Sequence, residues 1–147
     1  MDSRRAAPTL GIAVSLLLVA LLAVPYLVVE NGGAVATYYD AGALTPWAGG
    51  LMALVAVIVF AAGREERTDP DTAAGAGVGL GLVVLLVAAL WAVTVPSEVV
   101  LQLTTDRPLA GPLTTATVVE YHRWAVAAAA ALPFGAALWY ARTLRLF

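Results

Sequence analysis

The 147-residue chain has the composition of a membrane protein rather than that of a soluble domain of this length. Hydrophobic residues make up 61% of it and charged residues 12%, and the mean hydropathy is +0.87. A soluble domain carries roughly 25% charged residues, so lipid must be the solvent for much of this surface. The net charge of −2 argues against nucleic acid as a partner, and the absence of cysteine excludes disulfides, iron–sulfur ligation and zinc–thiolate sites.

Four apolar stretches are each long enough to cross a bilayer as a helix, which needs about 20 residues. We expect the spans at about residues 10–29, 43–62, 73–95 and 120–142, within one transmembrane domain of residues 1–147. The stretches lack the alternation of barrel strands, and an isolated strand cannot satisfy its backbone in lipid. The predicted fold is therefore all-α, an integral membrane four-helix bundle.

A cleaved signal peptide is the alternative for the first span. Ser3-Arg4-Arg5 resembles half of a twin-arginine signal, and Ala34-Val35-Ala36 resembles a cleavage site. The apolar run is about 20 residues long, however, whereas the apolar core of a signal peptide has about 7–15. We therefore expect the first span to stay in the protein as an anchor.

The distribution of arginine, the basic residue used throughout, predicts the orientation of the bundle. One side carries Arg4, Arg5, Arg64, Arg67, Arg142 and Arg145, and the other carries Arg107 and Arg123. Because basic residues favour the cytoplasmic side, we expect both termini to be cytoplasmic and the protein to be a multi-pass protein of the cell membrane.

The connections differ in length. The inner loop at residues 63–71 is short and polar, so the second and third helices should be antiparallel neighbours. The first outer connection, residues 30–42, is rich in Gly and Tyr and is expected to be a loop. The longest outer segment, residues 96–123, lies between the third and fourth helices.

Within this long segment, residues 99–104 are weakly strand-like, or they extend the third helix beyond Pro96. A turn is expected at residues 106–108. The fourth helix is expected to begin early, at about Thr114, with its first turns outside the bilayer.

Small residues on the third and fourth spans form a packing pattern, since small residues four apart let helix backbones approach closely. They are Gly75, Gly77, Gly79, Gly81, Ala127, Ala131 and Gly135. We expect them to pack the helices of one chain together, with an interface between copies as the alternative. Pro25 and Pro133 lie inside spans and are expected to produce kinks that neighbouring helices accommodate, with a functional hinge as the alternative.

Chemistry inside the membrane is not indicated. The interiors of the spans, which for the fourth span means Trp124 to Ala141, contain no carboxylate or base of the kind that proton-coupled transporters place at mid-membrane. Sequence motifs for phosphate binding, metal hydrolysis or a nucleophilic serine are also missing. No cofactor is expected, and a single histidine excludes bis-histidine haem within one chain.

Ionisable residues gather instead at the predicted outer rim. His122, Glu120, Glu30 and Asp40 are the candidate ligands for a metal ion there, and Glu120 with His122 could alternatively form an acid–base pair. Residues two apart on a helix point away from each other. The structural interpretation is therefore favoured, in which Glu120 pairs with Arg123, and Arg123 and Trp124 anchor the helix.

Several short motifs resemble a family of uncharacterised small four-helix membrane proteins from halophilic archaea. They are Thr37-Tyr38-Tyr39-Asp40-Ala41-Gly42, Thr45-Pro46, residues 60–67, residues 91–96, His122-Arg123-Trp124 and residues 138–142. The resemblance covers nearly the whole chain. It implies four spans and an archaeal cell membrane, and it brings no activity or functional residue with it.

The sequence thus favours a non-enzymatic accessory or structural membrane subunit. Its expected partners are the lipid bilayer and either another membrane protein or further copies of itself. A small oligomeric pore or carrier is one alternative, for which the glycine-rich third span could line an interface. A sensor of a ligand or metal at the outer face is the other.

Overall fold

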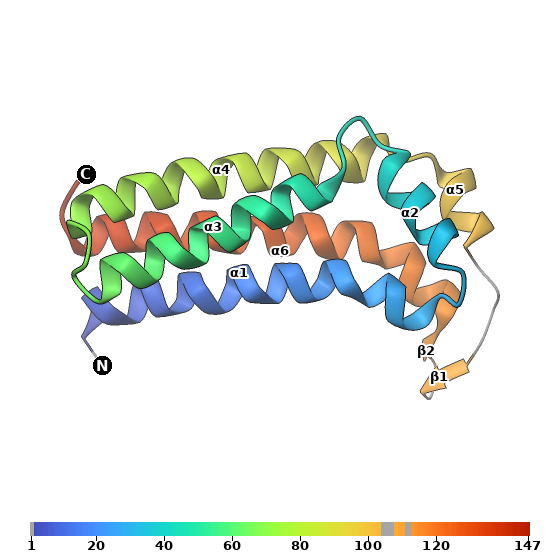
Figure 1. Ribbon diagram of the computed structural model, residues 1–147, viewed down its shortest axis with the longest axis horizontal. Coiled ribbons are helices and arrows are strands. Elements are labelled where there is room, and N and C mark those ends of the chain that lie inside the picture. The colour runs from blue at the N-terminus through green and yellow to red at the C-terminus, as the bar shows by residue number, and fades with distance from the viewer. Residues whose placement is uncertain (1, 104–107, 111–112) are drawn as a thin grey trace.

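The computed structural model describes residues 2–103, 108–110 and 113–147. Four long helices of this part lie side by side (Figure 1): α1 (Ser3–Val28), α3 (Pro46–Arg64), α4 (Pro70–Thr94) and α6 (Thr115–Thr143). Each is long and apolar enough to cross a membrane. The helical architecture and the four membrane-capable helices predicted from the sequence are confirmed.

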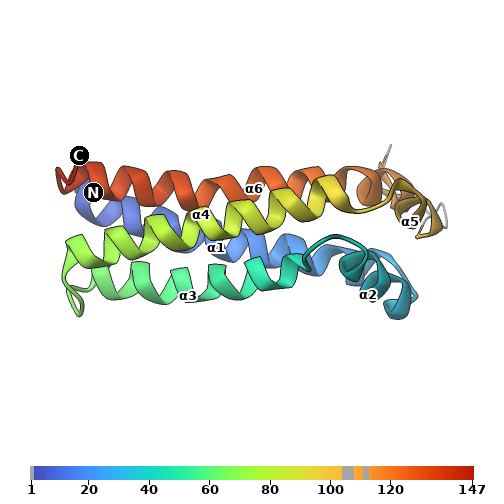
Figure 2. The same cartoon turned by 90° about the horizontal axis from the view of Figure 1, so that it is seen from above.

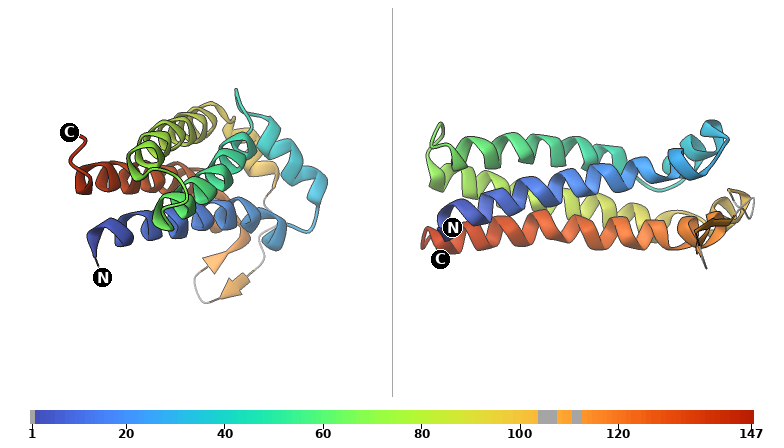
Figure 3. Two further views of the ribbon diagram at one scale, coloured as in Figure 1. Left: turned by 60° about the vertical axis from the view of Figure 1, so that its left-hand side comes forward. Right: turned by 90° about the horizontal axis from the view of Figure 1, so that it is seen from below.

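The helices form an up-and-down bundle in which each packs on its neighbours along the chain and α6 closes the ring against α1. Both termini lie at one end of the bundle (Figure 2), which we call the terminal end. The opposite end, which we call the capped end, carries the short elements α2 (Gly32–Asp40), α5 (Ser97–Gln102), β1 (Pro108–Ala110) and β2 (Leu113–Thr114). The two strands pair as a small antiparallel hairpin that projects from the bundle (Figure 3).

Local sequence explains where the helices begin and end. The side chains of Asp2, Asn31, Asp69 and Thr114 accept hydrogen bonds from backbone N–H groups in the first turns of α1, α2, α4 and α6, which otherwise have no partner. At the terminal end, α3 and α6 are each followed two residues later by a residue in the left-handed conformation, Glu66 (φ 55°) and Arg145 (φ 59°). The next N–H in each case bonds back to the last turn, Arg67 to Ala62 and Leu146 to Ala141, as in a Schellman motif.

The capped end differs from the sequence expectations in two places. The segment expected to be a Gly- and Tyr-rich loop contains the helix α2, because Asn31 caps it and its tyrosines are buried in the bundle. Residues 99–104 were expected as a strand or as an extension of the third helix, but Ser97–Gln102 form the separate helix α5 after Pro96. The early start of the fourth helix is confirmed at Thr115. Residues 106–107 of the expected turn lie outside the described residues.

The core consists of two clusters of buried side chains stacked along the bundle. The cluster nearer the terminal end is built around Phe60, with small residues from all four long helices. Gly11 and Gly77 face the Phe60 ring. A Cβ added at Gly11 would come within 2.6 Å of a ring carbon, and one added at Gly77 within 3.1 Å. The other cluster, toward the capped end, contains large side chains, among them Leu18, Leu22, Tyr38, Tyr39 and Trp91.

The predicted packing residues divide into two groups. Gly77 and Gly81 face the interior, and a Cβ on Gly81 would lie 2.7 Å from the Cα of Phe134. Gly75, Gly79 and Gly135 have open space where a Cβ would be. Ala127 packs at the edge of the capped-end cluster, and Ala131 is exposed.

Candidate functional site

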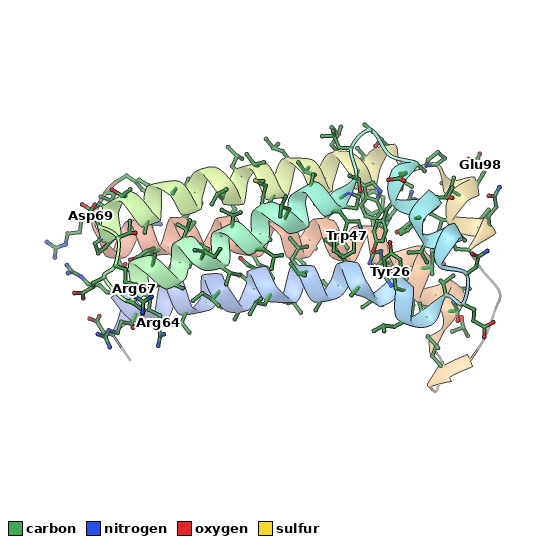
Figure 4. All side chains as sticks on the ribbon, in the orientation of Figure 1. Tyr26, Trp47, Arg64, Arg67, Asp69 and Glu98 are labelled. Atoms are coloured by element: carbon green, nitrogen blue, oxygen red, sulfur yellow. The ribbon has the colours of Figure 1, made fainter. Side chains whose placement is uncertain are left out.

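The capped end contains a buried cluster of rings from three elements. Tyr38 and Tyr39 come from α2, Trp91 from α4 and His122 from α6, and each is at most 4% exposed. The Tyr38 ring lies edge-on to Trp91, with centroids 5.2 Å apart, and 5.9 Å from His122. Tyr26 and Trp47, labelled in Figure 4, extend the cluster toward the surface at the same end.

His122 compensates for a backbone hydrogen bond that is missing from α1. Pro25 has no N–H, so it cannot donate to the carbonyl of Leu21 four residues earlier in α1. His122 supplies the donor from across the bundle, with its Nε2 2.8 Å from the Leu21 oxygen. An unpaired carbonyl buried away from water costs about 1–3 kcal/mol. The ring therefore satisfies a group that the helix itself leaves open.

The second ring nitrogen is also engaged. The Tyr38 hydroxyl lies 3.1 Å from Nδ1 of His122. Because a carbonyl only accepts, Nε2 must carry a proton, and in the neutral ring Nδ1 then accepts from the Tyr38 hydroxyl. The result is a directed chain from the Tyr38 O–H through the imidazole to the Leu21 carbonyl, and it joins α2, α6 and α1.

Tyr39 makes a parallel connection. Its hydroxyl donates to the carbonyl of Leu22, 2.5 Å away. Burial raises the pKa of both tyrosines above the usual value, an effect that nearby Arg123 partly offsets for Tyr38. Both hydroxyls therefore stay protonated and act as donors, which is what their acceptors require.

Arg123 lies beside this cluster, and its observed contacts differ from the predicted one. The expected ion pair with Glu120 is wrong: both residues are described and no ion pair joins them. Instead, Nη1 of Arg123 donates to the carbonyl of Val95, 3.0 Å away, at the end of α4. Its guanidinium carbon also lies 5.1 Å from the centre of the Trp124 ring. An exposed ion pair with Glu120 would contribute little to stability. The guanidinium instead satisfies a free helix carbonyl and gains a cation–π contact.

A pocket of about 260 Å³ opens next to Arg123 between α5 and α6. Its lining combines Glu120 and the Ser97 side chain with apolar groups, including Val100 and Ala116. Nε of Arg123 is buried and has no hydrogen-bond partner. The pocket thus combines an unused guanidinium donor with apolar walls.

The four candidate metal ligands are placed as follows. His122 points into the bundle with both nitrogens engaged, whereas Glu120, Glu30 and Asp40 are exposed. Within the described residues, no three His, Asp or Glu side chains gather closely enough to hold a metal ion. The structure therefore does not bring these four residues together into one site.

Sequence reasoning missed the partners of His122. Tyr38 and Tyr39 fall in the segment expected to be a loop, Trp91 falls within the third expected span, and Pro25 is expected to produce a kink. One signal was available, because a proline inside a membrane span leaves the carbonyl four residues earlier without its usual donor. A search for a polar side chain to satisfy that carbonyl would have pointed to the single histidine.

The comparison with known proteins bears on the whole bundle. Residues 1–145 match the model of a family described as a family of unknown function, DUF7548. The chain belongs to this family. The match includes α1 to α5 and all of α6, so the His122 cluster lies within the DUF7548 region. Searches of curated proteins and of solved structures returned no match. The predicted membership of an uncharacterised family is confirmed for DUF7548.

Proposed function

We propose that this DUF7548 protein is a non-enzymatic accessory subunit that docks, through the outward face of α4, on a helix of another membrane protein. The observation that carries the proposal is the pair Gly75 and Gly79. They lie one turn apart, and nothing in the described chain occupies the space where their Cβ atoms would be.

The neighbouring glycines provide the comparison. The fold itself accounts for Gly81, where a Cβ would meet the Phe134 backbone at 2.7 Å, and Gly77 is tightly packed, with a Cβ 3.1 Å from the Phe60 ring. Gly75 and Gly79 have no such requirement, although a glycine inside a helix costs roughly 0.5–1 kcal/mol relative to alanine. Small residues four apart are the surface on which a second helix packs closely in lipid. An external helix would give these two glycines a role.

The interior of the bundle supports an inert subunit rather than a pore within one chain. Among the described residues, Ser15, Thr115 and His122 are the buried polar side chains. Thr115 and His122 belong to the capped end, so Ser15 alone lies deep among the spans. A water path needs polar groups along its length.

Location and orientation are part of the proposal. The four membrane-capable helices and six arginines at the terminal end support a protein of the cell membrane with both termini in the cytoplasm. Because the chain has no cysteine, single-cysteine variants Ser3→Cys and Glu98→Cys can be made directly. An impermeant maleimide added outside intact cells should label Cys at position 98 and spare position 3. The reverse labelling would overturn the orientation.

Docking is tested by purification of the full chain in mild detergent from its native membrane. The wild type should retain a membrane protein in fixed stoichiometry, and Gly75→Leu with Gly79→Leu should lose it. Ala13→Leu with Ala20→Leu, at exposed positions of α1, is the matched control and should retain it. A wild-type chain that purifies alone would refute the proposal, and a homo-oligomer sensitive to the same glycines would favour the oligomeric alternative.

A second function, sensing of a small anionic ligand at the outer face, is favoured by the pocket between α5 and α6. Its support is a cavity of about 260 Å³ that Arg123 lines, together with the buried Nε of the same residue, which has no hydrogen-bond partner. Arg123→Gln should abolish the thermal stabilisation produced by a ligand such as a short-chain carboxylate, while Arg142→Gln, at the other end, should not. Equal stabilisation of both variants would exclude a site at this pocket.

A further inference from the structure

The terminal end contains a second pocket, of about 210 Å³, that is distinct from the capped-end site. It lies where the N-terminus of α1 meets the end of α3 and the last turns of α6. Its charged lining is three arginines, Arg4, Arg5 and Arg64, and two acids, Asp2 and Glu66. Figure 4 shows Arg64 at this end together with Arg67 and Asp69 of the α3–α4 connection. The cavity is far larger than the roughly 10–15 Å³ that one water needs.

Asp2 and Glu66 form no ion pair with the arginines of the pocket. Asp2 is used as the cap of α1, where its carboxylate accepts the N–H of Arg4 at 3.3 Å. Arg64 pairs through Nη1 with Glu65, 2.9 Å away, which lies outside the lining. Within the described part of the chain that is the one ion pair, so the guanidinium groups of Arg4 and Arg5 have no carboxylate partner there.

One arginine that lines the pocket has a donor without an acceptor. Nε of Arg64 is buried and has no hydrogen-bond partner. The Tyr140 side chain is 1% exposed, and it lines the same pocket beside Gly63, where an added Cβ would come within 2.9 Å of its hydroxyl oxygen. Buried donors are normally satisfied. The missing element is therefore an acceptor, and an anionic one suits the arginines.

We propose that this pocket binds the phosphate group of an anionic ligand at the membrane surface, with the headgroup of an anionic phospholipid as its source. Phosphate offers several oxygens to guanidinium donors, which bind it in a planar, bidentate manner. The pocket lies at the ends of the apolar helices, which is the level of lipid headgroups, and basic pockets between membrane helices bind such headgroups. Glycine at position 63 leaves room for the Tyr140 hydroxyl that would complete the donor set.

The test uses the full chain reconstituted with defined lipids and native mass spectrometry to count retained lipid. The wild type should retain one phosphatidylglycerol in preference to phosphatidylcholine. Arg4→Gln with Arg5→Gln should lower that retention about tenfold or more, since each basic group near the surface contributes about fivefold. Tyr140→Phe, which keeps the ring, should lower it less.

The matched control is Arg142→Gln with Arg145→Gln, which removes the same charge from exposed positions at the same end outside the pocket. It should leave retention within about twofold, whereas an equal loss in both double variants would mean general charge attraction and would overturn the site. Equal retention of phosphatidylcholine would overturn it as well. A titration with inorganic phosphate distinguishes the source: saturable stabilisation by phosphate without lipid retention would overturn the lipid assignment and leave a soluble phosphate as the ligand.

Discussion

Pro25 and His122 are complementary across the bundle: the imidazole donates the hydrogen bond that the proline cannot. Nε2 of His122 lies 2.8 Å from the carbonyl of Leu21, the residue whose usual donor would be the N–H at position 25. The carbonyl that the proline leaves free and the buried imidazole would each be unfavourable alone, and each satisfies the other by this hydrogen bond. The free energies of substitution at these two positions should not be additive.

A double-mutant cycle measures this coupling. His122→Phe keeps a ring but leaves the Leu21 carbonyl and the Tyr38 hydroxyl without partners, so we expect it to lower the free energy of unfolding in detergent by about 2 kcal/mol or more. In a Pro25→Ala background the helix supplies its own N–H to Leu21, and the same substitution should cost about 1 kcal/mol less. Identical costs in the two backgrounds would show that the proline and the histidine are independent.

The tyrosine hydroxyls can be tested separately. Tyr38→Phe removes the donor to Nδ1 of His122, and Tyr39→Phe removes the donor to the Leu22 carbonyl. Each should lower the free energy of unfolding by about 1 kcal/mol. Tyr121→Phe is the control, because that side chain is 62% exposed. Unfolding curves of the two buried variants that overlay the control would contradict these hydrogen bonds.

Alkaline pH should weaken the capped end. Burial raises the pKa of Tyr38 and Tyr39 in the folded protein, whereas an unfolded tyrosine titrates at about 10. Because the pKa of each tyrosine is higher in the folded protein, the protonated hydroxyls contribute their full stabilisation below a pH of about 10. That stabilisation is lost as the pH rises toward the pKa of the folded state. Tyrosinate absorbance of the folded protein should therefore lag behind that of the denatured chain. In Tyr38→Phe the lagging fraction should shrink, and an unchanged titration would refute the assignment.

How far the sequence predicts this molecule depends on the range of the forces. The four long helices follow from uninterrupted apolar runs, since lipid leaves the backbone few alternatives, and the start of α6 follows from Thr114 as a cap. The position of α2 does not, because Asn31 can begin a helix only where Tyr38 and Tyr39 find partners on α1, α4 and α6. The contact of Arg123 with the Val95 carbonyl could not be predicted from the sequence either. Local spacing favoured Glu120 as the partner, and the free carbonyl at the end of α4 is 28 residues away in sequence.

The alternating glycines of α4 allow a matched pair of substitutions. Gly81→Ala would put a methyl group 2.7 Å from the Cα of Phe134, a backbone atom that cannot turn aside. The resulting separation of α4 from α6 should cost about 1–3 kcal/mol. Gly79→Ala meets open space, so it should gain roughly 0.5–1 kcal/mol from the lower entropy of the unfolded chain. Thermal unfolding of the isolated chain in detergent tells the two apart, and a destabilising Gly79→Ala would mean that α4 has a neighbour there after all.

The ends of α3 and α6 offer a final prediction, because both place a residue with a Cβ in the left-handed conformation. Glu66 has φ 55° and Arg145 has φ 59°, which costs a non-glycine residue roughly 1–2 kcal/mol. Arg145→Gly should therefore raise the free energy of unfolding by about 1 kcal/mol, and it leaves the terminal-end pocket intact because Arg145 does not line it. Arg145→Ala is the control: it removes the same charge and keeps the strain. If the alanine variant gains as much stability as the glycine variant, the benefit comes from removing an arginine at this crowded basic end, and the backbone conformation contributes nothing to it.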